Sequence, residues 1–299
     1  MTEYKSCVLC NRKCGIDRAS TRGRCGVGSE IRVSRAALHF WEEPIISGER
    51  GSGTIFFSGC SLGCIYCQNR EISRGESGLI ISEKRLSEIM LELEGQGAHN
   101  INFVTPTHYA PSIIRATATA RASGLRVPTV YNTGSYDTRE TIKSLNGTVN
   151  IYLPDLKYYK SETAKAYSGA QDYPEVARAA IEEMVGQVGA AKIGDDGLMQ
   201  SGVIVRVLLL PSHLAEAKLN VKYLHDSYGD DIYISLMSQY TPAADLPKPL
   251  NRRVTSSEYA ELCDYAESIG VTLGFTQEHS SAEESFIPPF DHSGVLKSM

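Results

Sequence analysis

Residues 53–75 read GTIFFSGCSLGCIYCQNREISRG. Residues 54–57 have the apolar, aromatic composition of a short buried β-strand. Three cysteines follow as C-x3-C-x2-C, at Cys60, Cys64 and Cys67, so they lie on the loop that leaves this strand. Three thiolates can bind three irons of a [4Fe–4S] cubane, which leaves the fourth iron open to a substrate or cosubstrate. A zinc site completed by a fourth ligand is the alternative, although zinc ribbons usually place C-x2-C pairs on turns.

The sequence around this loop alternates short β-rich runs with segments of helical apolar spacing. The expected strands are residues 54–57, 101–104, 127–131, 149–153, 203–210 and 232–237, with 271–275 as a less regular seventh. The expected helices are residues 83–95, 111–123, 175–188, 214–227 and 256–269. This alternation predicts an α/β fold with a parallel sheet of right-handed βαβ units.

Five or six such units suit a partial (β/α)6-type TIM barrel with a small N-terminal metal-binding module. A doubly wound open sheet is the alternative, and periodicity alone does not separate the two. In both folds the functional groups lie at the carboxyl ends of the strands. We expect a cysteine-rich module over residues 1–50, the barrel over 51–276 and a C-terminal tail over 277–299, partly draped over the body.

Composition and charge narrow the classes of partner and location. The chain has 299 residues and a net charge of −5, and its basic residues are scattered, which argues against nucleic acid as a partner. No apolar stretch reaches about 18 residues, and the N-terminus has no signal-peptide core, so we expect no membrane segment and a cytoplasmic protein. Seven of the eight cysteines lie in the first 67 residues, a clustering typical of metal ligands. The eighth, Cys263, has the setting of an ordinary buried thiol.

A second group of cysteines precedes the first strand. Cys7, Cys10, Cys14 and Cys25 supply four thiolates within 19 residues. Four thiolates complete a tetrahedral zinc site or a second, fully ligated iron–sulfur cluster, and unligated thiols are the weaker alternative. Such a closed site could stabilise the module or, if it holds iron, relay electrons. We favour zinc or a rubredoxin-like structural site narrowly over an iron–sulfur cluster.

The C-x3-C-x2-C motif after the first strand, with Tyr66 before the third cysteine, resembles the signature of the radical SAM superfamily. The run Cys67-Gln68-Asn69-Arg70 is similar to that of the pyruvate formate-lyase activating enzymes. Further segments are similar to an activating-enzyme-like subgroup that carries an N-terminal cysteine motif: NINFVTPTHYAP (100–111), VPTVYNTGSY (127–136), VNIYLPDLKYY (149–159), YSGAQDYPEVARAAIEEMVGQVG (167–189) and YISLMSQYTP (233–242).

The resemblance implies a radical SAM oxidoreductase with a [4Fe–4S] cluster and S-adenosylmethionine (SAM) as cofactors. Reductive cleavage of SAM would give a 5′-deoxyadenosyl radical, which would take hydrogen from a glycine of a glycyl-radical enzyme. The expected electron donor is a flavodoxin or ferredoxin, and the expected state is a monomer. A small-molecule or peptide substrate is the alternative function, and a non-catalytic metal-binding scaffold is a third.

The resemblance also places further residues near SAM. Tyr66 borders the cysteine loop, either at the adenine or in simple packing. Where the superfamily often has a Gly-Gly-Glu-type run, this chain has residues 104–108, so Thr105 or Thr107 becomes the candidate oxygen acceptor. Asn132 lies in a run similar to the D-T-N-G of the activating enzymes.

The remaining candidates follow the later strands. Asp155 and Lys157 match the D-L-K of the activating enzymes, with a structural contact between them as the alternative. Arg206 interrupts an apolar strand, so its guanidinium must bind SAM or form a salt bridge with Asp155. The candidate substrate contacts are His108, Gln239 and Tyr240, and for His108 the alternative role is to cap the helix that follows.

Overall fold

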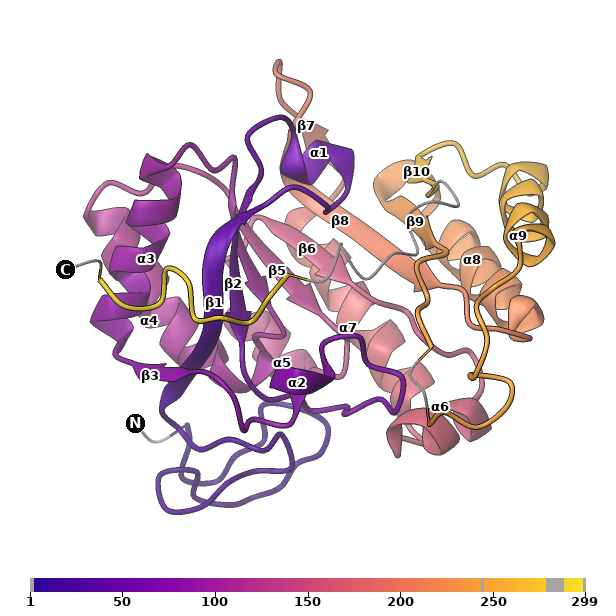
Figure 1. Cartoon of the computed structure of the whole chain (residues 1–299). Helices are drawn as coiled ribbons and strands as arrows, with labels where there is room; N and C mark the ends of the chain where they lie inside the picture. Colours follow the sequence, from indigo (N-terminus) through magenta and orange to yellow (C-terminus); the bar gives the residue numbers. More distant parts are fainter. Residues whose placement is uncertain (1–2, 243–244, 278–287, 298–299) are drawn as a thin grey trace.

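The computed structural model describes residues 3–242, 245–277 and 288–297. Its centre is a ten-stranded sheet with the strand order β10-β9-β8-β6-β5-β4-β2-β1-β3, to which β7 adds at β8 (Figure 1). The strands are β1 (Ile31–His39), β2 (Ser52–Phe57), β3 (Leu79–Ile81), β4 (Ile101–Val104), β5 (Thr129–Thr133), β6 (Ile151–Pro154), β7 (Lys192–Ile193), β8 (Met199–Leu208), β9 (Tyr233–Met237) and β10 (Gly274–Phe275). The helices are α1 (Pro44–Ser47), α2 (Arg70–Ser73), α3 (Glu83–Gly95), α4 (Ala110–Ala122), α5 (Arg139–Ser144), α6 (Ser161–Ser168), α7 (Tyr173–Val188), α8 (Leu214–Tyr228) and α9 (Ser256–Ser268).

The parallel part of the sheet follows the chain order. Strands β2, β4, β5, β6, β8, β9 and β10 are parallel, each beside the next. A doubly wound sheet reverses its strand order at a switch point, and no such reversal occurs along these strands. The described strands leave β10 and β3 as the two edges, so the sheet is open. The partial barrel therefore stays a prediction, whereas the mixed α/β fold with a parallel sheet is confirmed.

The local signals in the sequence placed most of these elements correctly. All seven expected strands and all five expected helices are present, with ends shifted by a few residues. Ser82 caps α3, because its hydroxyl accepts a hydrogen bond from the Arg85 N–H at 3.1 Å. Thr255 and Glu258 form a capping box at the start of α9. No helix of the described residues is long and apolar enough to cross a membrane.

The N-terminal region is part of the sheet from residue 31 onward. We expected residues 31–39 inside a separate module, but they form β1, which pairs antiparallel with β2 from His39 opposite Ser52 to Val33 opposite Phe57. The physical reason is the alternation of buried side chains such as Ile31 and Val33 along IRVSRAALH. The boundary that we expected between the module and the barrel at residue 50 thus falls between two paired strands of one sheet, β1 and β2.

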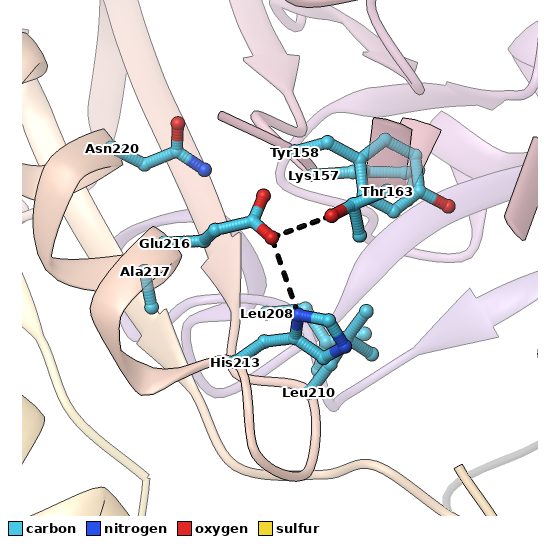
Figure 2. A pocket seen from close by; sticks show the side chains of 9 residues that line it. All are labelled: Lys157, Tyr158, Thr163, Leu208, Leu210, His213, Glu216, Ala217 and Asn220. Carbon is cyan, nitrogen blue, oxygen red and sulfur yellow. Dashed lines mark hydrogen bonds and ion pairs between the residues drawn. The ribbon is translucent and has the colours of Figure 1, made fainter. Parts of the chain in front are cut away.

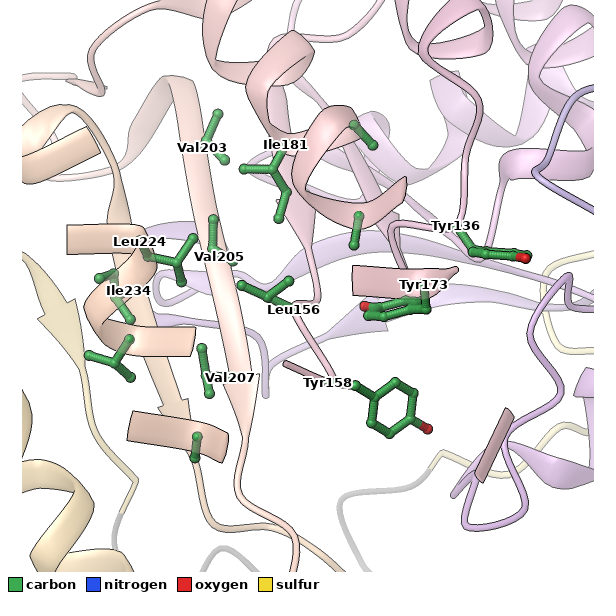
Figure 3. Close-up of a cluster of buried hydrophobic side chains, with 14 of the residues drawn as sticks. Tyr136, Leu156, Tyr158, Tyr173, Ile181, Val203, Val205, Val207, Leu224 and Ile234 are labelled. Atoms are coloured by element: carbon green, nitrogen blue, oxygen red, sulfur yellow. The ribbon is translucent and has the colours of Figure 1, made fainter. Parts of the chain in front are cut away.

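The largest cluster of buried apolar side chains lies between the sheet and helices α7 and α8 (Figure 3). Val203, Val205 and Val207 of β8 point into this cluster, whereas Ile204 belongs to a smaller cluster on the opposite face. Strand β8 is therefore buried on both faces, as its continuous apolar sequence predicted. This alternation leaves Arg206 on the face away from the helices.

Part of the C-terminal tail packs on the outside of β1. Residues 278–287 and 298–299 lie outside the described residues. Residues 288–297 run along β1 toward α3 (Figure 1, yellow). The Ala36 N–H donates to the Ser293 carbonyl at 2.9 Å, and Arg35 forms an ion pair of 2.7 Å with Asp291. These contacts hold residues 288–297 against β1, the strand that leads into the cavity described next.

Candidate active site

One cavity of about 200 Å³ opens at the carboxyl ends of the parallel strands. Its position is where α/β folds place their functional groups. It brings together all three loop cysteines and eight of the other nine proposed residues. The lining residues that the sequence singled out are Cys60, Cys64, Tyr66, Cys67, Thr105, Asn132, Asp155, Lys157, Arg206, Gln239 and Tyr240.

The cysteine loop leaves β2 through a tight, glycine-dependent path. Gly59 has φ +92°, and a Cβ atom there would lie 2.7 Å from the Cys25 carbonyl oxygen, so only glycine fits. The Cys60 N–H donates a hydrogen bond to that same oxygen at 3.1 Å. The loop then turns at Cys64, whose carbonyl accepts from the Cys67 N–H at 3.2 Å.

The chemistry of these thiols fits an iron–sulfur cluster. Burial, reinforced by the neighbouring thiols, raises the pKa of Cys60 and raises that of Cys67 to about 12. Buried thiolates at this position therefore need nearby positive charge, which iron ions supply. Among the described residues no three His, Cys, Asp or Glu groups converge as they would around a single ion. A cubane does not require such convergence, because each thiolate binds a different iron.

A layer of polar side chains separates the cavity from a small cluster of buried apolar side chains, called the plug below. Side chains two residues apart on a strand point to the same face. Just beyond the plug, that face carries Asn132 from β5, Asp155 from the end of β6 and Arg206 from β8. The plug consists of Ile46, Val130, Ile151, Leu153, Met199 and Ile204.

Arg206 is the centre of this layer. Its Nε lies 2.8 Å from Asp155 Oδ1, its Nη2 lies 2.5 Å from Asn132 Oδ1, and its Nη1 lies 3.4 Å from Glu42 Oε2. Lys157 Nζ binds the other carboxylate oxygen of Asp155 at 2.6 Å. Both structural contacts that we weighed against ligand binding are therefore present, and the same groups also line the cavity.

Glu42 is a cavity residue that sequence reasoning missed. It follows β1 and accepts hydrogen bonds from Asn102 Nδ2 at 3.0 Å and Asn132 Nδ2 at 3.3 Å. Its signal was the run HFWEEP (residues 39–44), in which two acids stand between aromatic residues and a proline. His39 and Trp41 of the same run also line the cavity.

Burial and pairing set the charges of this layer. Burial alone would raise the pKa of Asp155, but Arg206 and Lys157 lower it below its usual value. For Glu42, burial raises the pKa, and the nearby Arg206 guanidinium offsets only part of that rise. The two cations therefore favour the charged form of Asp155, whereas burial disfavours the charged form of Glu42.

Thr105 adds a strained turn at the end of β4. Its φ is +57°, a left-handed value that is unusual for a β-branched residue. The Thr105 N–H donates to the Asn132 carbonyl at 2.9 Å, which holds the turn against the neighbouring strand. Strain of this kind is concentrated at functional sites. The structure places Thr105 in the cavity wall, where the sequence expected an acceptor.

The aromatic and substrate candidates divide into two groups. Tyr66 and Tyr240 line the cavity with their ring centroids 6.0 Å apart, and Gln239 lies beside them. His108 does not line the cavity: it is buried, with Nε2 2.8 Å from the Ser58 carbonyl oxygen. It makes no cap hydrogen bond to α4 either, so it fills the interior behind the cysteine loop.

The N-terminal cysteines gather below the loop. Cys7, Cys10 and Cys25 are buried and Cys14 is half-buried. Burial, with smaller contributions from the other three thiols, raises the pKa of Cys10 to about 12. The described thiols do not converge around one ion, so the preference for a tetrahedral zinc site is not supported.

A second, much smaller pocket lies beside α8 (Figure 2). Its volume is about 10 Å³, which suits one water molecule at most. Glu216 accepts from the Thr163 hydroxyl at 2.6 Å and lies 3.3 Å from His213 Nδ1. These pairs satisfy one another, so this pocket is a structural polar cluster.

Comparison with known proteins agrees with this geometry. Residues 54–186 match the Radical SAM superfamily. An uncharacterized protein of Methanocaldococcus jannaschii, MJ0674, is 28% identical over 282 residues, which cover 90% of this chain and 77% of that protein. Crystal structures of Streptococcus suis SuiB (12% identity, TM-score 0.50) and of the FeFe-hydrogenase maturase HydG from Carboxydothermus hydrogenoformans (13%, 0.47) are also similar.

The two structural likenesses differ in coverage. The SuiB match covers 76% of this chain and 48% of SuiB, and the HydG match covers 73% of this chain and 56% of HydG. The chain thus spans about half the length of these solved structures, and at such low identity the SuiB likeness shows the fold alone. The superfamily match implies a [4Fe–4S] cluster and SAM as cofactors. Residues 54–186, which include the three loop cysteines, therefore form a radical SAM superfamily domain.

Proposed function

We propose that this chain is a radical SAM enzyme that takes hydrogen from a glycine of a glycyl-radical enzyme. The observation that carries the first half is the shared cavity: Cys60, Cys64 and Cys67 line it together with the polar layer around Arg206. A cluster on three cysteines, once bound, supplies the electron that cleaves SAM to methionine and a 5′-deoxyadenosyl radical.

The polar layer suits the charged groups of SAM. Arg206 has five N–H donors and uses three of its nitrogens on Asp155, Asn132 and Glu42, so further donors remain for a ligand. Lys157 is a second cation and lies close enough to Cys60 and Cys67 to offset part of the rise in the pKa of both thiols. We assign the SAM carboxylate to these two cations and the ammonium group to oxygen acceptors such as Thr105.

Apolar side chains also line the cavity. They would shield a reactive radical from water and from unintended hydrogen donors. They come from the ends of four strands and from the cysteine loop itself. These residues are Phe56, Leu62, Val104, Leu208 and Met237.

The choice of a protein substrate rests on the sequence resemblance and on the rim of the cavity. Trp41 is 61% exposed and lines the cavity, and its neighbour Phe40 is 49% exposed. Ile65, between two of the cysteines, is 38% exposed. Exposed aromatic and aliphatic side chains beside a deep site are typical of surfaces that bind another protein. A glycyl-radical enzyme would dock here, with flavodoxin or ferredoxin as electron donor and the chain itself as a monomer.

The proposal is tested in two stages. Anaerobic reconstitution should load about four irons on the three loop cysteines, and the reduced protein should convert SAM to 5′-deoxyadenosine. Incubation with a candidate glycyl-radical enzyme should then give a glycyl-radical EPR signal, and Cys64→Ala protein serves as the control. SAM cleavage without that signal would redirect the function to a small molecule or peptide. If a protein with intact cysteines does not cleave SAM, the remaining hypothesis is a non-catalytic metal-binding scaffold.

We also propose that the N-terminal thiols hold a second metal centre. Four thiols within one small module, three of them buried, support this assignment. Metal analysis of a Cys60/Cys64/Cys67 triple alanine variant would report this centre alone. Iron there supports an electron relay, zinc supports a structural site, and an absence of both overturns the assignment.

A further inference from the structure

The end of helix α6 lies directly on the cysteine loop. Ser168 is the last residue of α6, and Gly169 ends the helix with a left-handed φ of +56°. The Ile65 N–H donates to the Tyr167 carbonyl at 2.9 Å, which ties the loop to this helix end. Arg12 adds a second tie, since its Nη2 donates to the Ser168 carbonyl at 2.7 Å and its Nε to the Ser61 carbonyl at 2.8 Å. The backbone around Ser168 is therefore held in place from two sides.

This arrangement aims a hydroxyl chain at one cysteine sulfur. The Ser168 hydroxyl donates to Cys64 Sγ over 3.0 Å. The Tyr158 hydroxyl lies 2.6 Å from Ser168 Oγ. Because the serine proton is directed to sulfur, the serine oxygen accepts the tyrosine proton, and the chain runs from Tyr158 through Ser168 to Cys64. Ser168 is 6% exposed and Tyr158 is 1% exposed, so water does not compete for either hydroxyl.

We propose that Ser168 and Tyr158 are positioning residues that raise the reduction potential of the cluster bound by Cys64. A hydrogen bond to a ligating sulfur withdraws negative charge from the cluster, and the reduced cluster carries one more electron than the oxidised one. The donor therefore stabilises the reduced form more, and hydrogen bonds to cluster sulfurs are a recognised control of such potentials. The inference rests on the proposed cluster site and specifies what sets its redox poise.

The side-chain origin of this donor makes it testable. Backbone N–H groups act on the other two sulfurs, from Leu62 and Gly63 at Cys60 and from Asn69 at Cys67. A side-chain truncation leaves those backbone donors in place, whereas Ser168→Ala removes the side-chain donor to Cys64 and leaves the backbone intact. Tyr158→Phe removes only the outer hydroxyl of the chain and should have a smaller effect of the same sign.

The experiment is an EPR-monitored redox titration of reconstituted protein, with iron counted for each variant. Ser168→Ala should lower the reduced-to-oxidised ratio at a fixed potential about tenfold, a shift of ~59 mV to lower potential for a one-electron couple. Ser168→Thr keeps the hydroxyl and should restore most of the wild-type value. Ser268→Ala is the matched control, because Ser268 also ends a helix and its hydroxyl donates to the Tyr265 carbonyl of its own helix at 2.7 Å.

The outcomes separate this inference from the proposed function. A wild-type protein that binds no cluster would overturn both. Full iron content with an unchanged potential in Ser168→Ala would overturn the hydroxyl chain and leave the proposed function intact. If Ser168→Ala does not fold, an unchanged potential in Tyr158→Phe has the same force. A lowered potential in both variants, with Ser268→Ala unchanged, supports the chain.

Discussion

The backbone N–H of Cys60 donates a 3.1 Å hydrogen bond to the backbone carbonyl oxygen of Cys25. The first cysteine of the radical SAM loop is thereby joined to the last cysteine of the N-terminal group. Nothing in the sequence links the two groups of cysteines, yet the segments that carry them pack against each other. A disturbance on either side should be felt by the other, and this leads to the first prediction.

Gly59→Ala should damage both cysteine groups. The new Cβ would lie 2.7 Å from the Cys25 carbonyl oxygen, at a backbone φ of +92°. We expect a loss of roughly 1–3 kcal/mol in the free energy of unfolding and incomplete iron loading. Gly63→Ala is the control, since Gly63 also has positive φ (+64°) but has no atom within 4 Å of a built Cβ. Urea unfolding and iron analysis of the two variants decide the matter, and equal losses would show that the contact with Cys25 is unimportant.

Arg206→Met should be strongly destabilising. It would leave the buried Asp155 and Glu42 without their shared cation. Breaking a buried ion pair by removing one partner costs about 3–5 kcal/mol. A second change, Glu42→Gln, should recover part of that loss, because the raised pKa of Glu42 shows that its charge is already unfavourable.

Chemical unfolding of the single and double variants measures this coupling. Arg139→Met is the control: the exposed Arg139–Glu182 pair should contribute less than about 1 kcal/mol. A double variant that is no more stable than Arg206→Met would contradict a direct interaction between Arg206 and Glu42.

The buried His108 should make the protein sensitive to mild acid. Burial, and then the nearby Arg18 charge, lower its pKa from 6.5 to about 3. Between these values the unfolded chain binds the proton and the folded protein does not, so stability falls as the pH drops below about 6.5. Each pH unit in this window costs up to ~1.4 kcal/mol.

His108→Gln should lose this part of the acid dependence. Unfolding free energies measured from pH 7 to 5 should decline less steeply for the variant than for wild type. Parallel curves for wild type and His108→Gln would contradict a neutral buried imidazole.

Cysteine variants should separate catalytic thiols from an ordinary one. Cys64→Ala removes a proposed cluster ligand and should abolish production of 5′-deoxyadenosine. Cys263→Ala alters a half-buried thiol on α9 that does not line the cavity, and should retain both iron and SAM cleavage. Product chromatography after anaerobic reduction distinguishes the two. Cleavage that persists in Cys64→Ala would place the reactive site elsewhere.

The sequence predicted what depends on neighbours along the chain. The apolar period of residues 203–207 located β8, and the charge within it marked Arg206 as paired or ligand-binding, which the structure explains by three acceptors. Glu42 escaped prediction because its partner lies on a strand far along the chain. The cluster of cysteines led us to predict a separate module over residues 1–50, although the alternation of Ile31 and Val33 is already typical of a strand. Ser168 gave no signal, since a serine at the end of a helix is ordinary until the fold brings Cys64 to it.

The contact between Glu42 and Arg206 also orders events during synthesis. The two residues are 164 positions apart, so Glu42 leaves the ribosome long before its cation is made. Contacts of such long range form late, because the intervening chain must first be confined. Until β8 is synthesised, Glu42 and its partners Asn102 and Asn132 lack Arg206, and the polar layer that lines the cavity is incomplete. We therefore expect iron to be loaded after translation of β8, and a nascent chain stopped before residue 206 to hold its cysteines without a pocket around them.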